Sequence, residues 1–251
     1  MLGLGNSIYS SSTLEDTFGV LSTYSLSLDG AGDRATISSI TLPISTTGAN
    51  YSISFWAKRT DNSSIATVLG DDGVTATKRV AFDGQGDLLE IEGTQNGQTS
   101  SAAVTADTNW HHYVITWAGR SGGNDSGTII YEDATAIQTT VGGFGETNSS
   151  LFNFDTIGSA GDETAHTREF KGLLYQIAIW ETTLDQDAIT ALYNSGSPIP
   201  VELDSGNYDN SNQLLHLWKF NEGAGSISAE AASGRTATLL EGASFSSTTP
   251  S

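Results

Sequence analysis

Alternating side chains recur along most of the chain, and the segment 108–120 shows this pattern most clearly. Positions 110, 112, 114 and 116 fall on one side of an extended backbone, and positions 111, 113, 115 and 117 fall on the other. Aromatic and β-branched residues with a period of two predict a β-strand. A turn after position 118 and a second strand over 128–132 complete a predicted β-hairpin.

The same pattern predicts further short strands, each bounded by Gly, Asn or Asp. They are expected at 24–28, 35–40, 51–58, 65–69, 79–82, 88–92, 101–105, 135–140, 155–157, 173–180, 214–220 and 236–240. Many short strands without alternating helices indicate an all-β fold, and we expect an antiparallel two-sheet jelly-roll sandwich.

One short helix is predicted near 185–195. Asp185 is positioned to cap it, and Asp187 falls in the first turn, where the helix dipole favours a carboxylate. Gly196 ends the helix. Residues 197–212 are then expected to form a polar linker to the closing C-terminal strands.

Charge and composition narrow the classes of partner. The 251 residues include 10 Lys and Arg against 29 Asp and Glu, which gives a net charge of −19 and a pI of about 4.2. Such a surface repels nucleic acid and acidic lipid, and it suits cations, neutral sugars or a basic protein. The absence of cysteine excludes disulfides, thiolate metal sites and a cysteine nucleophile. No window approaches the ~20 apolar residues that cross a bilayer, so no membrane insertion is expected.

Residues 1–22 carry little hydrophobic pattern and include a Ser-rich tract. We expect an N-terminal arm there that anchors the protein or forms oligomers, the alternative being a disordered tail. A single domain is expected over 23–251. The first residues lack a basic region before an apolar run, so the sequence predicts no secretory signal peptide.

Several of these segments, in this order, resemble strands of concanavalin A-like, laminin-G-like jelly rolls. They are Tyr24-Ser-Leu-Ser-Leu-Asp-Gly, Ile53-Ser-Phe-Trp-Ala-Lys, Trp110-His-His-Tyr-Val-Ile-Thr-Trp, Phe170-Lys-Gly-Leu-Leu-Tyr-Gln-Ile-Ala-Ile-Trp and the helix that begins at Leu184-Asp-Gln-Asp. The phrase Leu217-Trp-Lys-Phe-Asn-Glu-Gly-Ala-Gly often precedes the first of these strands in the family, and here it follows the helix. That order, with the start Gly-Leu-Gly-Asn-Ser, is similar to lectin-like structural proteins of marine bacteriophages.

The resemblance implies adhesion to glycans or proteins, often with bound calcium, but the family also includes enzymes, so the fold alone does not decide function. Laminarinase-type relatives carry two Glu flanking an Asp on one strand. Here Glu90 and Glu92 would point the same way, but Ile91 replaces the Asp and the third carboxylate is missing. No Gly-x-Ser-x-Gly pattern is present.

Two histidines and two aspartates are the remaining candidates for metal chemistry. His111 and His112 lie on opposite faces of one strand, so they do not easily share a metal ion. Asp29 and Asp33 flank a Gly-rich turn and are the favoured calcium ligands, although Asp-Gly pairs are also ordinary turn residues. In the family, an Asp before a Ser-Gly turn often lies at the metal-associated end, and Ala231 takes that position here.

Sugar binding needs an exposed aromatic plane with polar groups nearby. Trp56 and Trp180 lie on strand faces opposite the Ile-rich ones, so they are predicted as stacking platforms unless those faces are covered. Trp110, Trp117 and Trp218 are expected in the core.

Three functions follow from these observations. The favoured hypothesis is a non-catalytic virion surface or appendage protein, which decorates a phage particle or contacts host surface glycans and is held to other virion proteins by its N-terminal arm. Such a protein is expected to form homo-oligomers, because weak single sites gain from multivalency. The second hypothesis is a free carbohydrate-binding lectin, and the third is a glycoside hydrolase.

Overall fold

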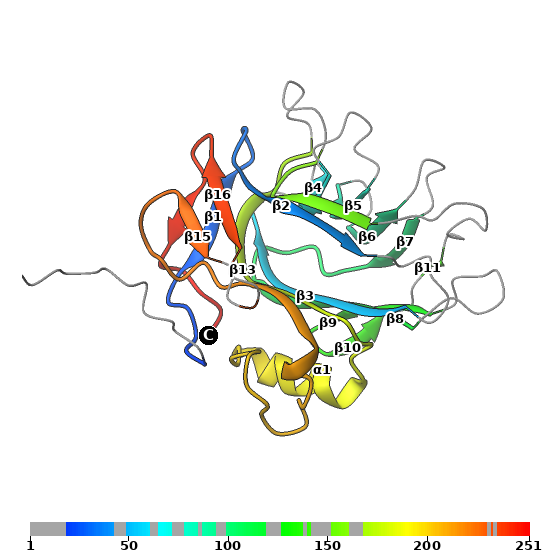
Figure 1. Ribbon diagram of the computed structural model, residues 1–251. Coiled ribbons are helices and arrows are strands. Elements are labelled where there is room, and N and C mark those ends of the chain that lie inside the picture. Colours follow the sequence, from blue (N-terminus) through cyan, green and yellow to red (C-terminus); the bar gives the residue numbers. More distant parts are fainter. Residues whose placement is uncertain are drawn as a thin grey trace, which may run out of the picture.

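The computed structural model describes residues 19–42, 49–60, 65–71, 78–84, 87–93, 99–118, 127–137, 140–141, 152–160, 168–229, 232 and 235–251. Within these ranges two antiparallel β-sheets lie face to face, with one α-helix beneath them (Figure 1). The predicted all-β sandwich is therefore confirmed. None of the helices in these ranges has the length and hydropathy needed to span a bilayer.

The eight-stranded sheet has the order β10-β9-β8-β3-β13-β1-β17, and β14 pairs with the far half of β13. Its strands are β1 (Ser25–Asp29), β3 (Asn50–Arg59), β8 (Trp110–Ala118), β9 (Thr128–Glu132), β10 (Thr135–Ile137), β13 (Lys171–Trp180), β14 (Leu214–Trp218) and β17 (Ser244–Ser246). The hairpin predicted from the alternating segment is present, because β8 and β9 pair antiparallel with Thr116 opposite Ile129.

The nine-stranded sheet has the order β11-β7-β6-β5-β4-β12-β2-β16-β15. Its strands are β2 (Arg34–Leu42), β4 (Ala66–Gly70), β5 (Lys78–Asp83), β6 (Leu88–Gly93), β7 (Thr99–Ala103), β11 (Thr140–Val141), β12 (Phe152–Ile157), β15 (Ile227–Ala229) and β16 (Thr236–Leu240). The single strand predicted over 135–140 is divided instead, since β10 belongs to one sheet and β11 to the other.

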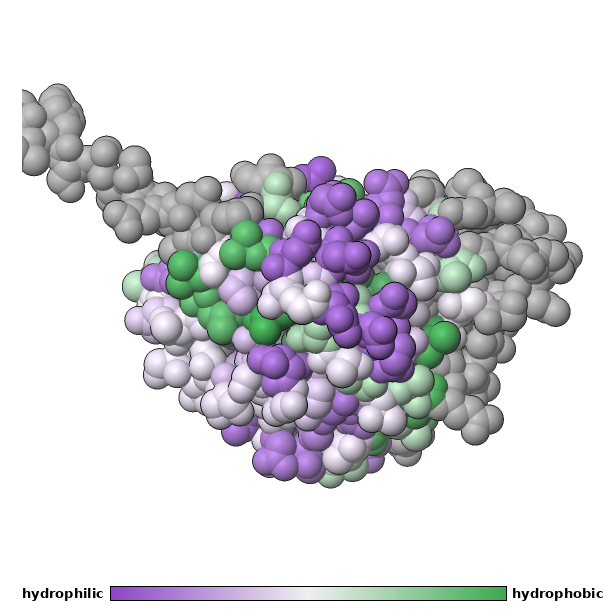
Figure 2. Space-filling view, turned by 90° about the horizontal axis from the view of Figure 1, so that it is seen from below, coloured by the Kyte–Doolittle hydropathy of each residue, from purple (hydrophilic) through white to green (hydrophobic). Residues whose placement is uncertain are grey.

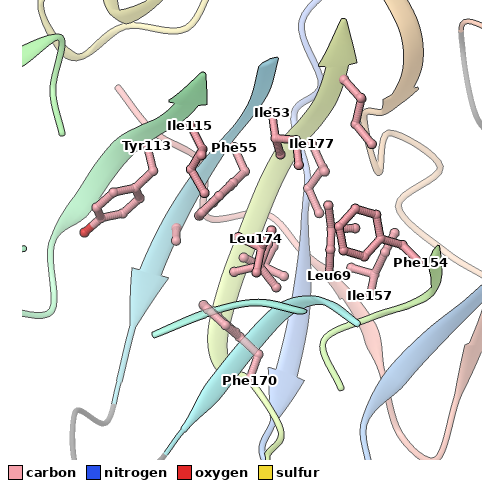
Figure 3. Packing of buried hydrophobic residues seen from close by; sticks show 14 of the residues in the cluster. Ile53, Phe55, Leu69, Tyr113, Ile115, Phe154, Ile157, Phe170, Leu174 and Ile177 are labelled. Carbon is pink, nitrogen blue, oxygen red and sulfur yellow. The ribbon is translucent and has the colours of Figure 1, made fainter. Parts of the chain in front are cut away.

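The main core fills the space between the two sheets (Figure 3). Tyr113 and Ile115 point into it from β8, and the period of two correctly assigned them to one face of that strand. Phe55 of β3 and Phe82 of β5 meet edge to face across the two sheets, with ring centroids 6.2 Å apart. Side-chain alternation thus decides which face of each strand is buried between the sheets.

A second core lies on the outer face of the eight-stranded sheet, under helix α1 (Gln186–Tyr193). The Asp185 carboxylate accepts a hydrogen bond from the Ala188 amide at 2.8 Å, so the predicted N-cap is present. The segment predicted as a linker follows one short 3-10 turn, η1 (Asn194–Gly196), and ends within a second, η2 (Ser211–Gln213). That prediction is wrong, because Val201 and Tyr208 are buried in this second core.

The first described residues lie against the domain and are not part of a free arm. The Gly19 amide donates to the Glu202 carboxylate at 3.4 Å, and the Ser22 hydroxyl is buried against the Phe220 carbonyl. The prediction of an arm over 1–22 is therefore corrected for its last four residues, and 1–18 lie outside the described residues.

The beginning and the end of the described fold meet at one sheet edge. The first strand, β1, pairs with the last strand, β17, and the Ser25 hydroxyl donates to the Thr248 carbonyl at 2.8 Å. The sequence pattern did not predict β17 or β15, because each has three residues, which is too short for alternation to be visible.

Candidate functional site

The outer face of the eight-stranded sheet is closed to ligands by the second core. Trp56 and Trp180 are 2% and 0% exposed, so neither offers a ring for sugar stacking and that prediction is corrected. The Trp180 indole N–H donates to the Tyr208 hydroxyl at 2.9 Å, and that hydroxyl donates to the Val201 carbonyl at 2.6 Å. Trp56 stacks on the His112 imidazole with centroids 4.8 Å apart. The face as seen from the α1 side is covered mainly by polar and weakly polar residues (Figure 2).

A serine and a histidine under this layer have the geometry of a nucleophile and its base. The Ser54 hydroxyl lies 2.7 Å from Nε2 of His112. The two residues are 3% and 2% exposed, however, and the His112 ring packs against Trp56 and Tyr193, whose rings also contact each other. Burial lowers the pKa of His112 to about 3, so the imidazole is neutral. The pair fixes the packing of β3 on β8 and is inaccessible to a substrate.

The neighbouring His111 is held between carboxylates at the other side of β8. Its Nδ1 lies 2.7 Å from Asp133 and its Nε2 lies 3.0 Å from Asp107. The hydrogen bond to Asp133 is the main cause that raises the pKa of His111 to about 9, against the opposing effect of burial. Glu132, 3.8 Å from the ring, adds to this effect. The imidazolium joins the loop before β8 to the turn after β9.

The outer face of the nine-stranded sheet carries polar side chains in register. Directly opposed residues run from Glu92 on β6 through Arg79 and Gly70 to Thr156 and Thr36. The row is interrupted at β4, because a Cβ on Gly70 would lie 2.1 Å from the Ser159 carbonyl oxygen. The backbone at 159–160 therefore crosses over Gly70 and divides this face into a charged part on β5 and β6 and a hydroxyl-bearing part on β12 and β2.

The charged part is formed by Arg79, Asp83, Glu90 and Glu92, which we call the Arg79 cluster. The guanidinium of Arg79 lies 2.7 Å from the Glu92 carboxylate and 4.0 Å from that of Glu90. The side chains of these three residues are 11%, 13% and 16% exposed. Burial is the main cause that raises the pKa of Glu90, and the negative charge of Asp83 adds to it.

Sequence reasoning found half of this cluster. The prediction that Glu90 and Glu92 share a face is confirmed by their common partner. Arg79 and Asp83 were missed as partners, because their proximity depends on the pairing of β5 with β6. The alternation along β5 could have placed Arg79 and Asp83 on the outer face, since positions 79, 81 and 83 alternate with the core residues Val80 and Phe82. Thr67, opposite Ala81 on the same face, is fully buried and its hydroxyl has no hydrogen-bond partner within the described ranges.

The predicted calcium ligands Asp29 and Asp33 come together with a third carboxylate, Glu169, around the turn between β1 and β2. Asp33 accepts a hydrogen bond from the Asp29 amide at 2.9 Å, and Glu169 accepts one from the Gly32 amide at 2.6 Å. Burial raises the pKa of Asp33, and the charges of Asp29 and Glu169 add to this shift. Its Oδ1 is buried, and none of the residues that the structure describes donates a hydrogen bond to it.

Such an oxygen is suited to a cation, yet the described residues include no group of three or more Asp, Glu or His side chains arranged to hold a metal ion. Calcium therefore stays a prediction. A calcium titration that raises the melting temperature of the wild type, and not that of Asp33→Asn, would confirm it.

Solved structures of other proteins share this fold. A candidate carbohydrate-binding protein from Bacteroides ovatus superposes with a TM-score of 0.59 at 14% identity, over 92% of this chain and 62% of its own. The chain thus spans less than two thirds of that protein. The heptameric SAP-like pentraxin of Limulus polyphemus gives a TM-score of 0.49 at 13% identity, over 68% of this chain and 81% of its own. The CBM40 of the Ruminococcus gnavus IT-sialidase gives a TM-score of 0.43 at 12% identity, over 65% of this chain and 99% of its own.

No curated protein matches the sequence. The family model of Laminin_G_3 matches residues 29–190, which run from the last residue of β1 through β2 to β13 and into α1. The chain belongs to the concanavalin A-like lectin/glucanases superfamily.

Proposed function

We propose that the protein is a non-catalytic carbohydrate-binding protein whose ligand contacts the Arg79 cluster. The observation that carries this proposal is the contrast between the two outer faces of the sandwich. One is covered by α1 and the segment 197–213, while the other carries a guanidinium and carboxylates, 11–16% exposed, in a fixed arrangement. Membership of a lectin-containing superfamily and the likeness in fold to the Bacteroides ovatus protein support it.

The chemistry of the cluster suits sugar hydroxyls. Carboxylates accept hydrogen bonds from hydroxyl groups, and charge-assisted hydrogen bonds are about twice as strong as neutral ones. The Glu92 carboxylate is already oriented by Arg79 at 2.7 Å, so little conformational freedom is lost when a ligand binds.

The position of Arg79 argues against hydrolysis at this site. A retaining glycosidase needs two carboxyl groups about 5–5.5 Å apart with the scissile bond between them. Here one guanidinium lies within 4.0 Å of both Glu90 and Glu92, where the glycosidic bond would have to lie.

The experiment is a glycan array probed with the isolated protein and two single-carboxylate variants. Glu90→Ala removes a hydrogen-bond acceptor from the cluster, and we expect glycan retention to fall at least tenfold, about 1.4 kcal/mol. Glu181→Ala removes an exposed carboxylate at the end of β13 on the opposite sheet and should leave retention unchanged. Equal losses in both variants, or no binding by the wild type, would count against the proposal.

A glycoside hydrolase is the second candidate, favoured by the raised pKa of Glu90 beside the ion-paired Glu92. Incubation of each retained glycan with the protein is expected to release no reducing ends. Release that disappears in Glu90→Gln would replace the binding proposal with a catalytic one.

We further propose that the sandwich is displayed on a phage particle, as a decoration or fibre protein held to other virion proteins by residues 1–18 and assembled as a homo-oligomer. The resemblance of the sequence order to marine phage structural proteins supports this context. Detection of the protein in purified virions by mass spectrometry would test it, and its recovery only in the particle-free fraction would favour a free lectin.

A further inference from the structure

We propose that the Arg79 cluster selects uncharged glycans and rejects glycans that carry a carboxylate, such as sialylated or uronic acid-containing oligosaccharides. This inference rests on the proposed function, because it names the class of sugar that the same site takes.

The charge of the cluster is the first argument. It combines three carboxylates, from Asp83, Glu90 and Glu92, with the one guanidinium of Arg79. A ligand carboxylate is held most strongly by a cation that can face it, because charge-assisted hydrogen bonds are about twice as strong as neutral ones. Arg79 lies 2.7 Å from one carboxylate and 4.0 Å from a second, so its positive charge is already balanced within the protein.

Burial makes the excess negative charge effective. The side chains of Arg79, Glu90 and Glu92 are each less than one fifth exposed, so little water screens them from an incoming anion. The same effect is seen at Glu90, because burial and the negative charge of the neighbouring Asp83 raise its pKa. A ligand carboxylate would enter an environment that disfavours the charge of the protein's own side chain.

The whole molecule acts in the same direction. With a net charge of −19, the protein repels anionic polymers before contact is made. This long-range repulsion is screened within about 8–10 Å at ordinary ionic strength, whereas the charges of the largely buried cluster are screened much less. Discrimination should therefore persist in salt.

The test is an array that pairs each neutral oligosaccharide with the same oligosaccharide carrying a terminal sialic or uronic acid. We expect the neutral member to be retained at least tenfold more strongly, both at low salt and at about 0.5 M NaCl. Each pair is also measured with EDTA and with calcium. Preferential retention of acidic members in either condition would overturn the inference, and calcium dependence would identify a bridging cation.

A neutralising variant supplies the matched control. Glu90→Gln keeps the shape of the side chain and removes one negative charge, so it should narrow the preference for neutral members severalfold. Glu181→Gln removes the same charge from the opposite sheet and should leave the preference unchanged. If both variants narrowed the preference for neutral glycans equally, the selectivity would come from net charge, and the role of the cluster would be overturned.

The two proposals fail differently. Absence of binding to every glycan defeats the proposed function itself. Binding that is strongest for acidic members leaves the proposed function standing and defeats only the selectivity of the cluster.

Discussion

Two adjacent histidines on β8 differ strongly in pKa because their side chains lie on opposite faces of the strand. His111 and His112 have the same ordinary pKa, yet one is raised to about 9 and the other lowered to about 3. The sequence correctly assigned them to opposite faces, because that follows from the period of two. It did not reveal the carboxylates around His111, which come from a turn and a loop that only the folded chain brings together.

His111 should make stability depend on alkaline pH. Its folded pKa lies above the ordinary 6.5, so the stabilisation is fully present below about 6.5 and is lost as the pH rises through about 9. Replacement by Asn should cost on the order of 2 kcal/mol at pH 6 and little at pH 10, after solvent screening of the ion pairs. Urea unfolding of both proteins at the two pH values measures this. A cost that is equal at both would show that the imidazolium charge contributes nothing.

Tryptophan exposure could not be predicted from the local pattern. Trp56 and Trp180 lie on the face away from the main core, as the alternation indicated, but α1 and the segment 197–213 cover that face. The sequence showed the helix without showing which sheet face it covers. Trp110, expected in the core, is half-buried because it begins β8 at the sheet end.

At the scale of elements, β13 is the strand on which the eight-stranded sheet depends. It pairs with β3 along one side and with β1 and β14 along the other. The pattern over 173–180 predicted this strand, and the structure begins it two residues earlier. Gly172 explains the difference, because its φ of +143° and its contact with β3 interrupt the side-chain alternation that makes a strand recognisable.

Gly172→Ala should be strongly destabilising. A Cβ there would lie 2.1 Å from the Lys58 carbonyl oxygen, so β3 and β13 would have to separate locally. We expect a loss of about 3 kcal/mol or more. Gly196→Ala is the matched control, since Gly196 also has a positive φ of +98° but has no atom within 4 Å of an added Cβ. Its cost should be about 1 kcal/mol in chemical denaturation, and similar losses in both variants would remove the steric explanation.

At the scale of the whole molecule, a buried ion pair holds distant segments together. Lys219, just after β14, lies 2.6 Å from Glu202, and both side chains are 3% exposed. Glu202 also accepts the Gly19 amide, so the pair joins the entering chain to the second half of the fold. No sequence pattern indicated this pair, because it links segments that follow no common periodicity.

Lys219→Met should cost about 3–5 kcal/mol, because it leaves the Glu202 charge buried and uncompensated. Combining it with Glu202→Gln removes both charges, and the double variant should be more stable than Lys219→Met alone. A double-mutant cycle by urea unfolding gives the coupling energy. Strictly additive losses would show that the two charges do not stabilise each other.

The acidic surface should make the fold sensitive to ionic strength. A net charge of −19 repels itself in the compact state, and salt screens that repulsion. We expect the melting temperature to rise as NaCl increases from about 10 to 300 mM. KCl at the same ionic strength should raise the melting temperature by the same amount. A melting temperature that stays constant or falls would show that local ion pairs outweigh the net repulsion.

The pairing of β1 with β17 has an architectural consequence. Because the chain enters and leaves on neighbouring strands, with Ser25 hydrogen-bonded to Thr248, the sandwich needs only one attachment edge. Another protein can accept it as an insertion in a surface loop, or many copies can be joined in tandem through that edge. In either arrangement the strands β5 and β6 lie on the side of the sandwich away from β1 (Figure 1), so they would face away from the point of attachment.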